Sequence, residues 1–226
     1  MTTSIYEHAE RVAREVAAGR HRELIGGLWE ELGRMQLEFA IAEGLRPEMT
    51  VVDVGCGCLR GGIHFVRYLQ SGNYYGVDAH RELLDAGHGI ELAAAGLRDR
   101  LPRENLLRST DFEFSRFGRR FDMAFAQSLF THLPSHRIQL CLERLAPAIR
   151  QGGSFYATFF ECPEDRPLAE PIDHQPGGIR TFAAADPYHY RSSDFDFACR
   201  GLPWDVRYVG DWHHPRAQRM LHFLRR

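Results

Sequence analysis

Short apolar runs alternate with segments of helical periodicity between residues 47 and 160, and this alternation limits the fold more than any other feature of the sequence. Each run is too brief for a helix, and several are rich in the β-branched residues that favour buried strands. The runs read VVDVG, YYGVD, NLLRS, FDMAFAQ and GSFYATFF. Strands that alternate with helices predict βαβ units with right-handed crossovers. We therefore expect an α/β fold: a doubly wound, mostly parallel sheet in three layers.

Helical periodicity is also found before the first strand. Apolar residues recur at helical spacing over residues 5–16 and again over residues 24–39, which predicts two amphipathic helices. These helices are expected to form either a cap over the functional site or an oligomer surface. Inside the core, a helix over residues 81–95 is expected, although Gly87 and Gly89 each cost about 1 kcal/mol relative to alanine.

The last third of the chain has a different character. Residues 161–190 are rich in Pro, Asp and Tyr without periodicity, which indicates a lid or a disordered segment. A short helix capped by Ser192 or Ser193 should follow. The runs WDVRYVG and MLHFL, which flank HHPRAQ, predict a terminal antiparallel hairpin. We expect one domain over residues 1–226, divided into a helical cap (1–46), a core (47–160), and a lid with the terminal hairpin (161–226).

The composition excludes several classes of protein. The 226 residues include 28 basic and 30 acidic side chains, so the net charge of −2 gives no uniform field for a nucleic acid. No apolar stretch reaches the roughly 18 residues needed to span a bilayer, and the start of the chain is too polar for a secretory signal. The five cysteines form no regular framework and are expected to be reduced thiols. A soluble cytoplasmic protein that contacts neither nucleic acid nor membrane is expected.

A glycine-containing loop directly follows the first strand. It reads Asp53-Val54-Gly55-Cys56-Gly57 and leads into a helix, which is where open α/β sheets bind their ligands. Asp78 ends the second strand, at the position that holds ribose hydroxyls in nucleoside sites. The dinucleotide fingerprint GxGxxG fails because Arg60 stands where the third glycine should be. Asp53 would repel a pyrophosphate, so this loop favours a cationic ligand with an α-amino group.

Five segments, taken in order, resemble the motifs of the class I S-adenosylmethionine-dependent methyltransferases over roughly residues 47–160. They are DVGCG, YYGVD, STDF, FDMAFAQSLFTHLP and LAPAIRQGGSFYATFF. The resemblance implies a sheet of seven strands whose terminal strand is antiparallel, in agreement with the predicted hairpin. It also implies an enzyme that uses S-adenosylmethionine as cofactor and releases S-adenosylhomocysteine.

The resemblance assigns cofactor contacts residue by residue. The loop would pass under the methionyl part, Asp53 would hold its ammonium group, and Asp78 would accept hydrogen bonds from the ribose hydroxyls. Asp111 would face the adenine amino group, Phe112 would pack near the ring, and Gln127 with Ser128 would line the reactive end. The full set of expected cofactor residues is Asp53, Gly55, Cys56, Gly57, Arg60, Asp78, Ala79, Asp111, Phe112 and Gln127.

Arg60 is assigned on a departure from the family pattern. The third glycine of the usual DxGxGxG is missing here, since Cys58 and Leu59 follow Gly57 before Gly61 and Gly62. By this departure from the pattern, Arg60 is available to pair with the cofactor carboxylate. The competing interpretation is a solvated cation at the start of a helix.

Methyl transfer to a hydroxyl or an amine also needs a proton acceptor, and a histidine is a natural base. Two clusters outside the cofactor motifs supply candidates: PYHY at residues 187–190 and HHPRAQ at residues 213–218. We expect His214 and His189 as catalytic bases. The residues expected to bind substrate are Tyr188, Tyr190, His213 and Arg216. Arg216 would favour an anionic acceptor.

Other histidines are given structural interpretations. His132 precedes Pro134 at a helix N-terminus, where side chains commonly satisfy backbone groups. No metal site is expected, because adjacent residues such as His213 and His214 point to different sides.

The sequence thus predicts a methyltransferase that acts on a small molecule, most simply at oxygen. An enzyme acting on a macromolecule is an alternative, against which stand the balanced charge and the lack of an NPPY-like tetrapeptide after the fourth strand. A non-catalytic S-adenosylmethionine-binding protein and a Rossmann dehydrogenase are the rivals from other classes. The oligomeric state and the acceptor are left open.

Overall fold

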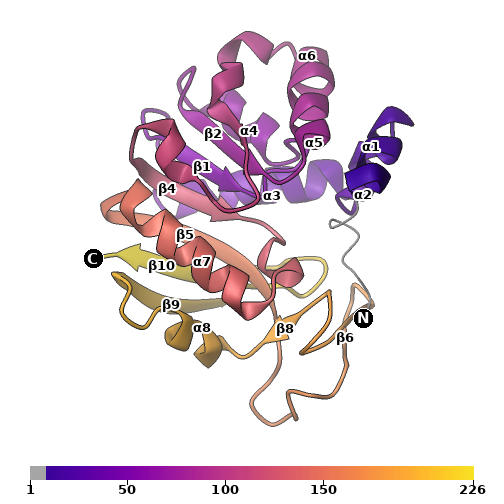
Figure 1. Ribbon diagram of the computed structural model, residues 1–226, viewed down its shortest axis with the longest axis vertical. Coiled ribbons are helices and arrows are strands. Elements are labelled where there is room, and N and C mark those ends of the chain that lie inside the picture. Colours follow the sequence, from indigo (N-terminus) through magenta and orange to yellow (C-terminus); the bar gives the residue numbers. More distant parts are fainter. Residues whose placement is uncertain (1–8) are drawn as a thin grey trace.

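The computed structural model describes residues 9–226, and its centre is a twisted sheet in the order β3-β2-β1-β4-β5-β10-β9 (Figure 1). The first five strands of this order pair in parallel, whereas β10 is antiparallel to both of its neighbours. The predicted α/β sheet with an antiparallel terminal strand is therefore confirmed. The strands are β1 (Val51–Val54), β2 (Tyr74–Asp78), β3 (Leu106–Arg108), β4 (Phe121–Ala126), β5 (Ile149–Glu161), β9 (Trp204–Asp211) and β10 (Arg219–Arg225).

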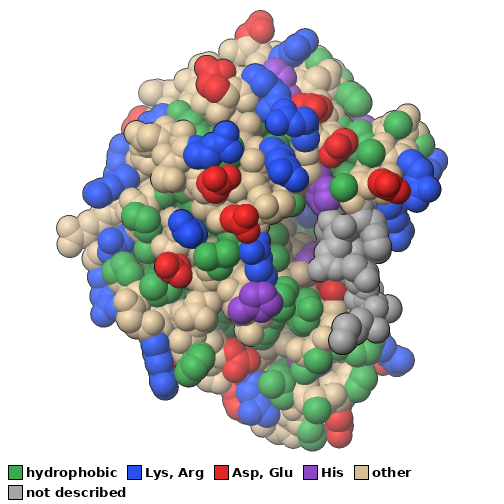
Figure 2. Space-filling view, in the orientation of Figure 1, with side chains coloured by type: hydrophobic (Ala, Val, Ile, Leu, Met, Phe, Trp, Pro, Cys, Tyr) green, Lys and Arg blue, Asp and Glu red, His purple; other side chains and the backbone are tan. Residues whose placement is uncertain are grey.

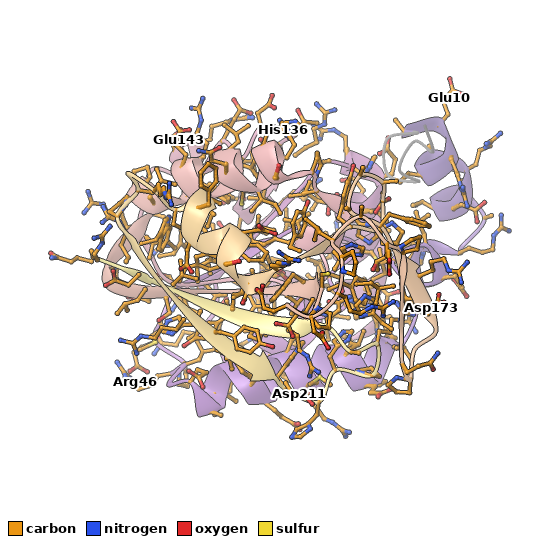
Figure 3. The ribbon with its side chains drawn as sticks, turned by 90° about the horizontal axis from the view of Figure 1, so that it is seen from below. Glu10, Arg46, His136, Glu143, Asp173 and Asp211 are labelled. Atoms are coloured by element: carbon orange, nitrogen blue, oxygen red, sulfur yellow. The ribbon has the colours of Figure 1, made fainter. Side chains whose placement is uncertain are left out.

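Helices cover both faces of this sheet. Val52 and Val54 face a core shared with α7 (Ser135–Leu145) and α8 (Ser192–Ala198), whereas Val51 faces α3 (Trp29–Ala42) and α4 (Gly62–Tyr68). This alternation follows from the two-residue repeat of a strand. Figure 3 shows Glu143 of α7 and Arg46, which follows α3, projecting outward on opposite sides of the sheet. No helix within residues 9–226 has the length and apolar character needed to cross a membrane.

The helix predicted over residues 81–95 is interrupted by a wider turn. It consists of α5 (Arg81–Ala86), a π-helical turn (Gly87–Glu91) and α6 (Leu92–Ala94). A Cβ on Gly87 would lie 2.6 Å from Leu59 and 2.9 Å from the backbone of Cys58, so only glycine fits there. Five 3₁₀ turns complete the core: Arg98–Arg100, Arg103–Asn105, Phe114–Phe117, Phe130–His132 and Ala146–Ala148.

The N-terminal helices form a cap that is more broken than predicted. α1 (Ala9–Ala17) and α2 (His21–Leu24) pack on α5, while Ile5 of the predicted first helix lies outside the described residues. The single helix expected over residues 24–39 is wrong, because the chain leaves the helix between α2 and α3. Gly26, Gly27 and Leu28 have φ values of 90°, 62° and 49°, which a right-handed helix cannot accommodate.

The segment after β5 contains more structure than its composition suggested. β6 (Ile172–His174) and β7 (Ile179–Thr181) form a small hairpin, and β8 (His189–Tyr190) pairs with the end of β5. The N-cap of α8 is Arg191, whose backbone N–H donates to the Asp194 carboxylate at 2.9 Å. The prediction of a serine cap is therefore wrong by one residue, since Asp194 supplies the capping carboxylate from within the first turn.

Candidate ligand-binding and active site

A cavity of about 1110 Å³ opens at the carboxyl ends of β1, β2 and β4. Ligands of open α/β sheets bind at this edge, where neighbouring strands connect in opposite directions. Asp53 in β1, Asp78 at the end of β2 and Gln127 just after β4 all line the cavity. The cap closes one side of it through Ile25 and Gln36.

The glycine loop after β1 keeps its backbone close to the cavity wall. Gly55 and Gly57 have φ values of 76° and 54°, in the region that glycine adopts without a steric penalty. The N–H groups of Gly55 and Cys56 both donate to the Val77 carbonyl, at 2.7 and 3.1 Å. The Cys56 thiol is turned toward β2, because a Cβ on Gly76 would lie only 2.7 Å from its sulfur. Burial raises the pKa of this thiol far above its ordinary value.

Two carboxyl groups lie on the floor of the cavity. The Asp78 carboxylate accepts the N–H of Gly57 and the N–H of His80, each at 2.9 Å. Asp53 is buried and accepts the hydroxyl of Tyr74 at 2.8 Å. Burial raises the pKa of Asp53 to about 7, and the nearby charge of Asp78 acts in the same direction. Burial also raises the pKa of Asp78, against the backbone N–H groups that favour its ionised form. The floor is therefore an electronegative site suited to a cation.

Arg60 lies beside this floor and also binds the cap. Its guanidinium donates to the carbonyls of Ile25 at 3.1 Å and of Gly27 at 2.9 Å. The charge of Arg60 opposes the upward shift in the pKa of Asp53, so the two groups are close enough to interact. The break between α2 and α3 thus supplies the carbonyls that hold this arginine at the cavity wall.

Asp111 and Phe112, which follow β3, were both expected to lie near the adenine, but only Phe112 lines the cavity. Phe112 is buried, lines the cavity and has a left-handed φ of 58°. Asp111 does not line it: its carboxylate is 67% exposed and pairs with Arg137 at 3.1 Å. Arg137 also lies over the Phe112 ring, 5.3 Å from its centroid. Ala79, the residue after Asp78, lines the cavity as expected.

The PYHY cluster does not supply a base. His189 is 1% exposed, and its Nδ1 and Nε2 bond to the Thr181 hydroxyl and the Leu168 carbonyl, each at 2.8 Å. Tyr190 donates its hydroxyl to the Leu133 carbonyl at 2.5 Å, and the Tyr188 ring packs parallel to the ring of Tyr190. These three side chains do not line the cavity. Their positions give them the role of holding the lid against β5, in place of the catalytic and substrate-binding roles suggested by sequence.

The residues between β9 and β10 are divided between surface and interior. His213 is exposed and has a φ of 66°, and its N–H donates to Asp211 at 2.9 Å. His214 is buried, with Nδ1 3.1 Å from the N–H of Arg216 and Nε2 2.9 Å from the side-chain amide of Gln127. Burial, together with the charges of Arg60 and Arg216, lowers the pKa of His214 to about 3. A ring so engaged is a poor proton acceptor, which corrects its expected catalytic role.

Arg216 does reach the cavity. It lines the wall, and its guanidinium donates to the carbonyl of Gly26. Arg60 and Arg216 therefore both donate to carbonyls of the segment Ile25–Gly27, although the two arginines lie far apart in the sequence.

A histidine given a structural interpretation from sequence has the better catalytic geometry. His132 lines the cavity, and its Nδ1 lies 2.5 Å from the Asp186 carboxylate. A carboxylate can only accept, so Nδ1 carries the proton and Nε2 is the basic atom. Two features of the sequence pointed toward this pair. One is the position of His132 just after the fourth strand, and the other is the Asp186-Pro187 turn. Nothing local linked residues that are 54 positions apart.

Metal ligation finds no support among residues 9–226, where no group of three or more His, Cys, Asp or Glu side chains is arranged to hold an ion. No protein-family model matches the sequence.

Comparison with solved structures identifies the fold. Magnesium protoporphyrin IX methyltransferase (ChlM) from Synechocystis PCC 6803, with bound S-adenosylhomocysteine, superposes with a TM-score of 0.64 at 13% identity, covering 96% of this chain and 99% of that one. The CcbJ methyltransferase from Streptomyces caelestis gives 0.63 at 15% identity, with coverage of 86% and 88%. The glycopeptide N-methyltransferase MtfA, also with S-adenosylhomocysteine, gives 0.60 at 16% identity, with coverage of 86% and 89%. The chain thus has the fold of the S-adenosylmethionine-dependent methyltransferases of class I.

Proposed function

We propose that this chain is an S-adenosylmethionine-dependent methyltransferase that modifies a small molecule at an oxygen atom. The observation that carries the proposal is the presence, in one cavity, of Asp53, Asp78 and His132, whose Nδ1 is paired with the Asp186 carboxylate. The acids suit a cationic nucleoside, and the histidine pair suits the removal of a proton. The neighbouring structures crystallised with S-adenosylhomocysteine support the same cofactor.

The residues present fit this cofactor. Asp53 would hold the α-ammonium group, Asp78 would accept from the ribose hydroxyls, and Phe112 would pack against the adenine. Arg60 would donate to the cofactor carboxylate while it keeps its hydrogen bonds to the Ile25 and Gly27 carbonyls of the cap. When bound, S-adenosylmethionine supplies an electrophilic methyl group on a sulfonium centre. Asp111 is kept as an adenine contact only if its pair with Arg137 opens, since its carboxylate now lies outside the cavity.

The protein's own contribution to the reaction is orientation and proton transfer. Asp186 holds His132 with Nδ1 protonated, so Nε2 can accept the proton of an acceptor hydroxyl. Arg216 lines the same cavity and would favour an acceptor that carries a negative charge. Basic and acidic side chains are interspersed on the face shown in Figure 2, which favours a small acceptor over a polyanion.

The test compares turnover with cofactor affinity. Methyl transfer from tritiated S-adenosylmethionine is measured against a panel of phenols, carboxylic acids and amines. His132→Ala should lower kcat by about 10²- to 10⁴-fold, the usual contribution of a general base. Its Kd for S-adenosylhomocysteine should stay within twofold of the wild-type value. Asp186→Asn should also lower kcat strongly, because the asparagine NH₂ can donate to Nδ1 and so favour the tautomer whose proton is on Nε2, which then cannot accept a proton.

His213→Ala is the matched control, since His213 is exposed and does not line the cavity. If His132→Ala turned over normally, His132 would not be the base. A protein that binds S-adenosylhomocysteine but methylates no member of the panel would favour the non-catalytic alternative.

A further inference from the structure

Gln36 of the cap helix α3 is a buried polar residue in the wall of the cavity. It is 3% exposed, and its carbonyl oxygen Oε1 has no hydrogen-bond partner among residues 9–226. Its side chain takes part in no hydrogen bond in the part of the chain that the structure describes. Buried side-chain amides are in most cases paired. An unpaired amide that lines a cavity therefore indicates a contact with a ligand.

Two glycines place this amide at the start of α4. A Cβ on Gly33 of α3 would lie 2.5 Å from the carbonyl oxygen of Arg60, and a Cβ on Gly61 would lie 2.0 Å from Oε1 of Gln36. Because both distances are too short for a real Cβ, the two segments can approach this closely only with glycine at both positions. The Gln36 amide consequently lies against Gly61, next to Arg60 in the sequence.

The following glycine relates this position to Asp53. A Cβ on Gly62 would lie 2.7 Å from the hydroxyl oxygen of Tyr74, and this hydroxyl donates to the Asp53 carboxylate at 2.8 Å. The Gln36 amide and the Tyr74–Asp53 pair thus contact two adjacent residues, Gly61 and Gly62. Gln36 is therefore at the Asp53 end of the cavity, where the amino-acid part of the cofactor is proposed to bind.

The orientation of the amide decides which kind of ligand group it can meet. The Cβ position on Gly61 is 2.0 Å from Oε1 but 3.5 Å from Nε2, so the carbonyl end is the one turned toward Gly61. The carbonyl end is buried there, and the NH₂ group is the polar end that a ligand in the cavity can reach. An NH₂ group only donates, so its partner must be an acceptor.

The α-carboxylate of the cofactor is the acceptor that this end of the cavity would receive. It would lie beside the Asp53 carboxylate and be repelled unless donors surround it. Arg60 supplies one donor group, although its Nη1 already donates to the carbonyls of Ile25 and Gly27. We propose, on the basis of the proposed function, that the NH₂ group of Gln36 donates a hydrogen bond to the α-carboxylate of the cofactor. Gln36 is a specificity-determining residue: it selects S-adenosylmethionine and S-adenosylhomocysteine over their decarboxylated forms.

The test compares two ligands by isothermal titration calorimetry of the full-length chain at pH 8. One is S-adenosylhomocysteine, and the other is its decarboxylated analogue, which keeps the adenosine, the sulfur and the ammonium group. Gln36→Met has a similar volume and no donor. It should raise the Kd for S-adenosylhomocysteine by about tenfold or more, the factor for a hydrogen bond to a charged group. Its Kd for the analogue should stay within twofold of the wild-type value.

Gln36→Glu separates charge from shape. It places a negative charge beside the ligand carboxylate, so it should weaken S-adenosylhomocysteine binding more than Gln36→Met does. The analogue carries only a positive charge, and its binding should not be weakened. Gln139→Met is the matched control, since Gln139 is exposed on α7 and does not line the cavity.

A structural role for Gln36 would give different results. Ligand-free Gln36→Met should be as stable as the wild type in urea unfolding, because the substitution removes no hydrogen bond within the protein. An equal loss of affinity for both ligands in Gln36→Met, or an unchanged Kd for S-adenosylhomocysteine, would overturn the proposal and leave the proposed function in place. A wild-type chain that binds neither ligand would overturn the proposed function and this contact with it.

Discussion

The protonation of Asp53 should control the affinity of this protein for S-adenosylhomocysteine. Burial raises the pKa of Asp53 to about 7, and Asp78 adds to that shift while the Tyr74 hydroxyl opposes it. In the complex, the ligand's ammonium group should keep Asp53 ionised. Affinity should therefore be full above pH 7 and should fall as the pH drops, because binding then releases a proton.

The size of the effect follows from the pKa. At pH 5, about 1% of the free protein carries an ionised Asp53, so Kd should rise about 100-fold between pH 8 and pH 5, or about 2.7 kcal/mol. Isothermal titration calorimetry at pH 5, 6, 7 and 8 measures this change. Repeating the pH 6 titration in buffers of different ionisation enthalpy should show release of about one proton.

Two variants make the assignment specific. Asp53→Asn should bind weakly with a flat pH profile. Tyr74→Phe should move the midpoint to higher pH, because the hydroxyl that it removes favours the ionised form of Asp53. A wild-type Kd that is equal at pH 5 and pH 8 would refute the reasoning.

The raised pKa of Asp53 also affects the stability of the ligand-free protein, but this stability depends on pH in the direction opposite to that of ligand affinity. The folded state favours neutral Asp53, since its pKa is raised from 3.8. This contribution to stability is present below pH 3.8 and is lost as the pH rises through 7. Asp53→Asn should therefore stabilise the ligand-free protein at pH 8, by up to about 4 kcal/mol, as measured by urea unfolding. A destabilised variant would show that Asp53 is ionised and well paired without ligand.

Three further outcomes are expected. Gly87→Ala should destabilise the protein by about 1–3 kcal/mol through overpacking, whereas Gly89→Ala, whose Cβ would meet nothing within 4 Å, should stabilise it by up to about 1 kcal/mol; equal effects in urea unfolding would contradict this. Glu91→Gln should loosen the cap by weakening the contacts of Glu91 with His21 and Arg22, seen as faster proteolysis near residue 25. Because these partners lower the pKa of Glu91, the wild-type cap should lose that support only as the pH falls below about 4.5. Arg60→Ala should weaken S-adenosylhomocysteine binding by about tenfold or more, as for a hydrogen bond to a charged group, and an unchanged Kd would remove Arg60 from the cofactor site.

The core could be predicted from sequence because its signals are local. Each strand that carries Asp53, Asp78 or Gln127 is a short apolar run, and each residue's place at the strand end follows from counting along it. The glycines at positions 26 and 27 also gave a usable local signal. Two adjacent glycines inside a helical pattern indicate a break, and the periodicity of the flanking leucines obscured it.

The acceptor side of the cavity could not be predicted, because its residues depend on distant partners. His189 and His214 were chosen for the polar character of their neighbours in sequence, yet the fold buries both rings and engages both nitrogens of each. His132 becomes a candidate base only when Asp186 is brought to it by the lid. Which histidine faces the cavity is therefore a property of the packing of residues 161–218 and not of any local pattern.

The central claim is that S-adenosylmethionine binds over Asp53 and Asp78, and calorimetric titration with S-adenosylhomocysteine at pH 8 tests it most directly. We predict saturable binding at one site per chain, a loss of affinity of at least about 100-fold in Asp78→Ala, as expected for removing a carboxylate that accepts two ligand hydrogen bonds, and no binding of NAD. Absence of binding at millimolar S-adenosylhomocysteine, or an unchanged Kd in Asp78→Ala, would contradict the account.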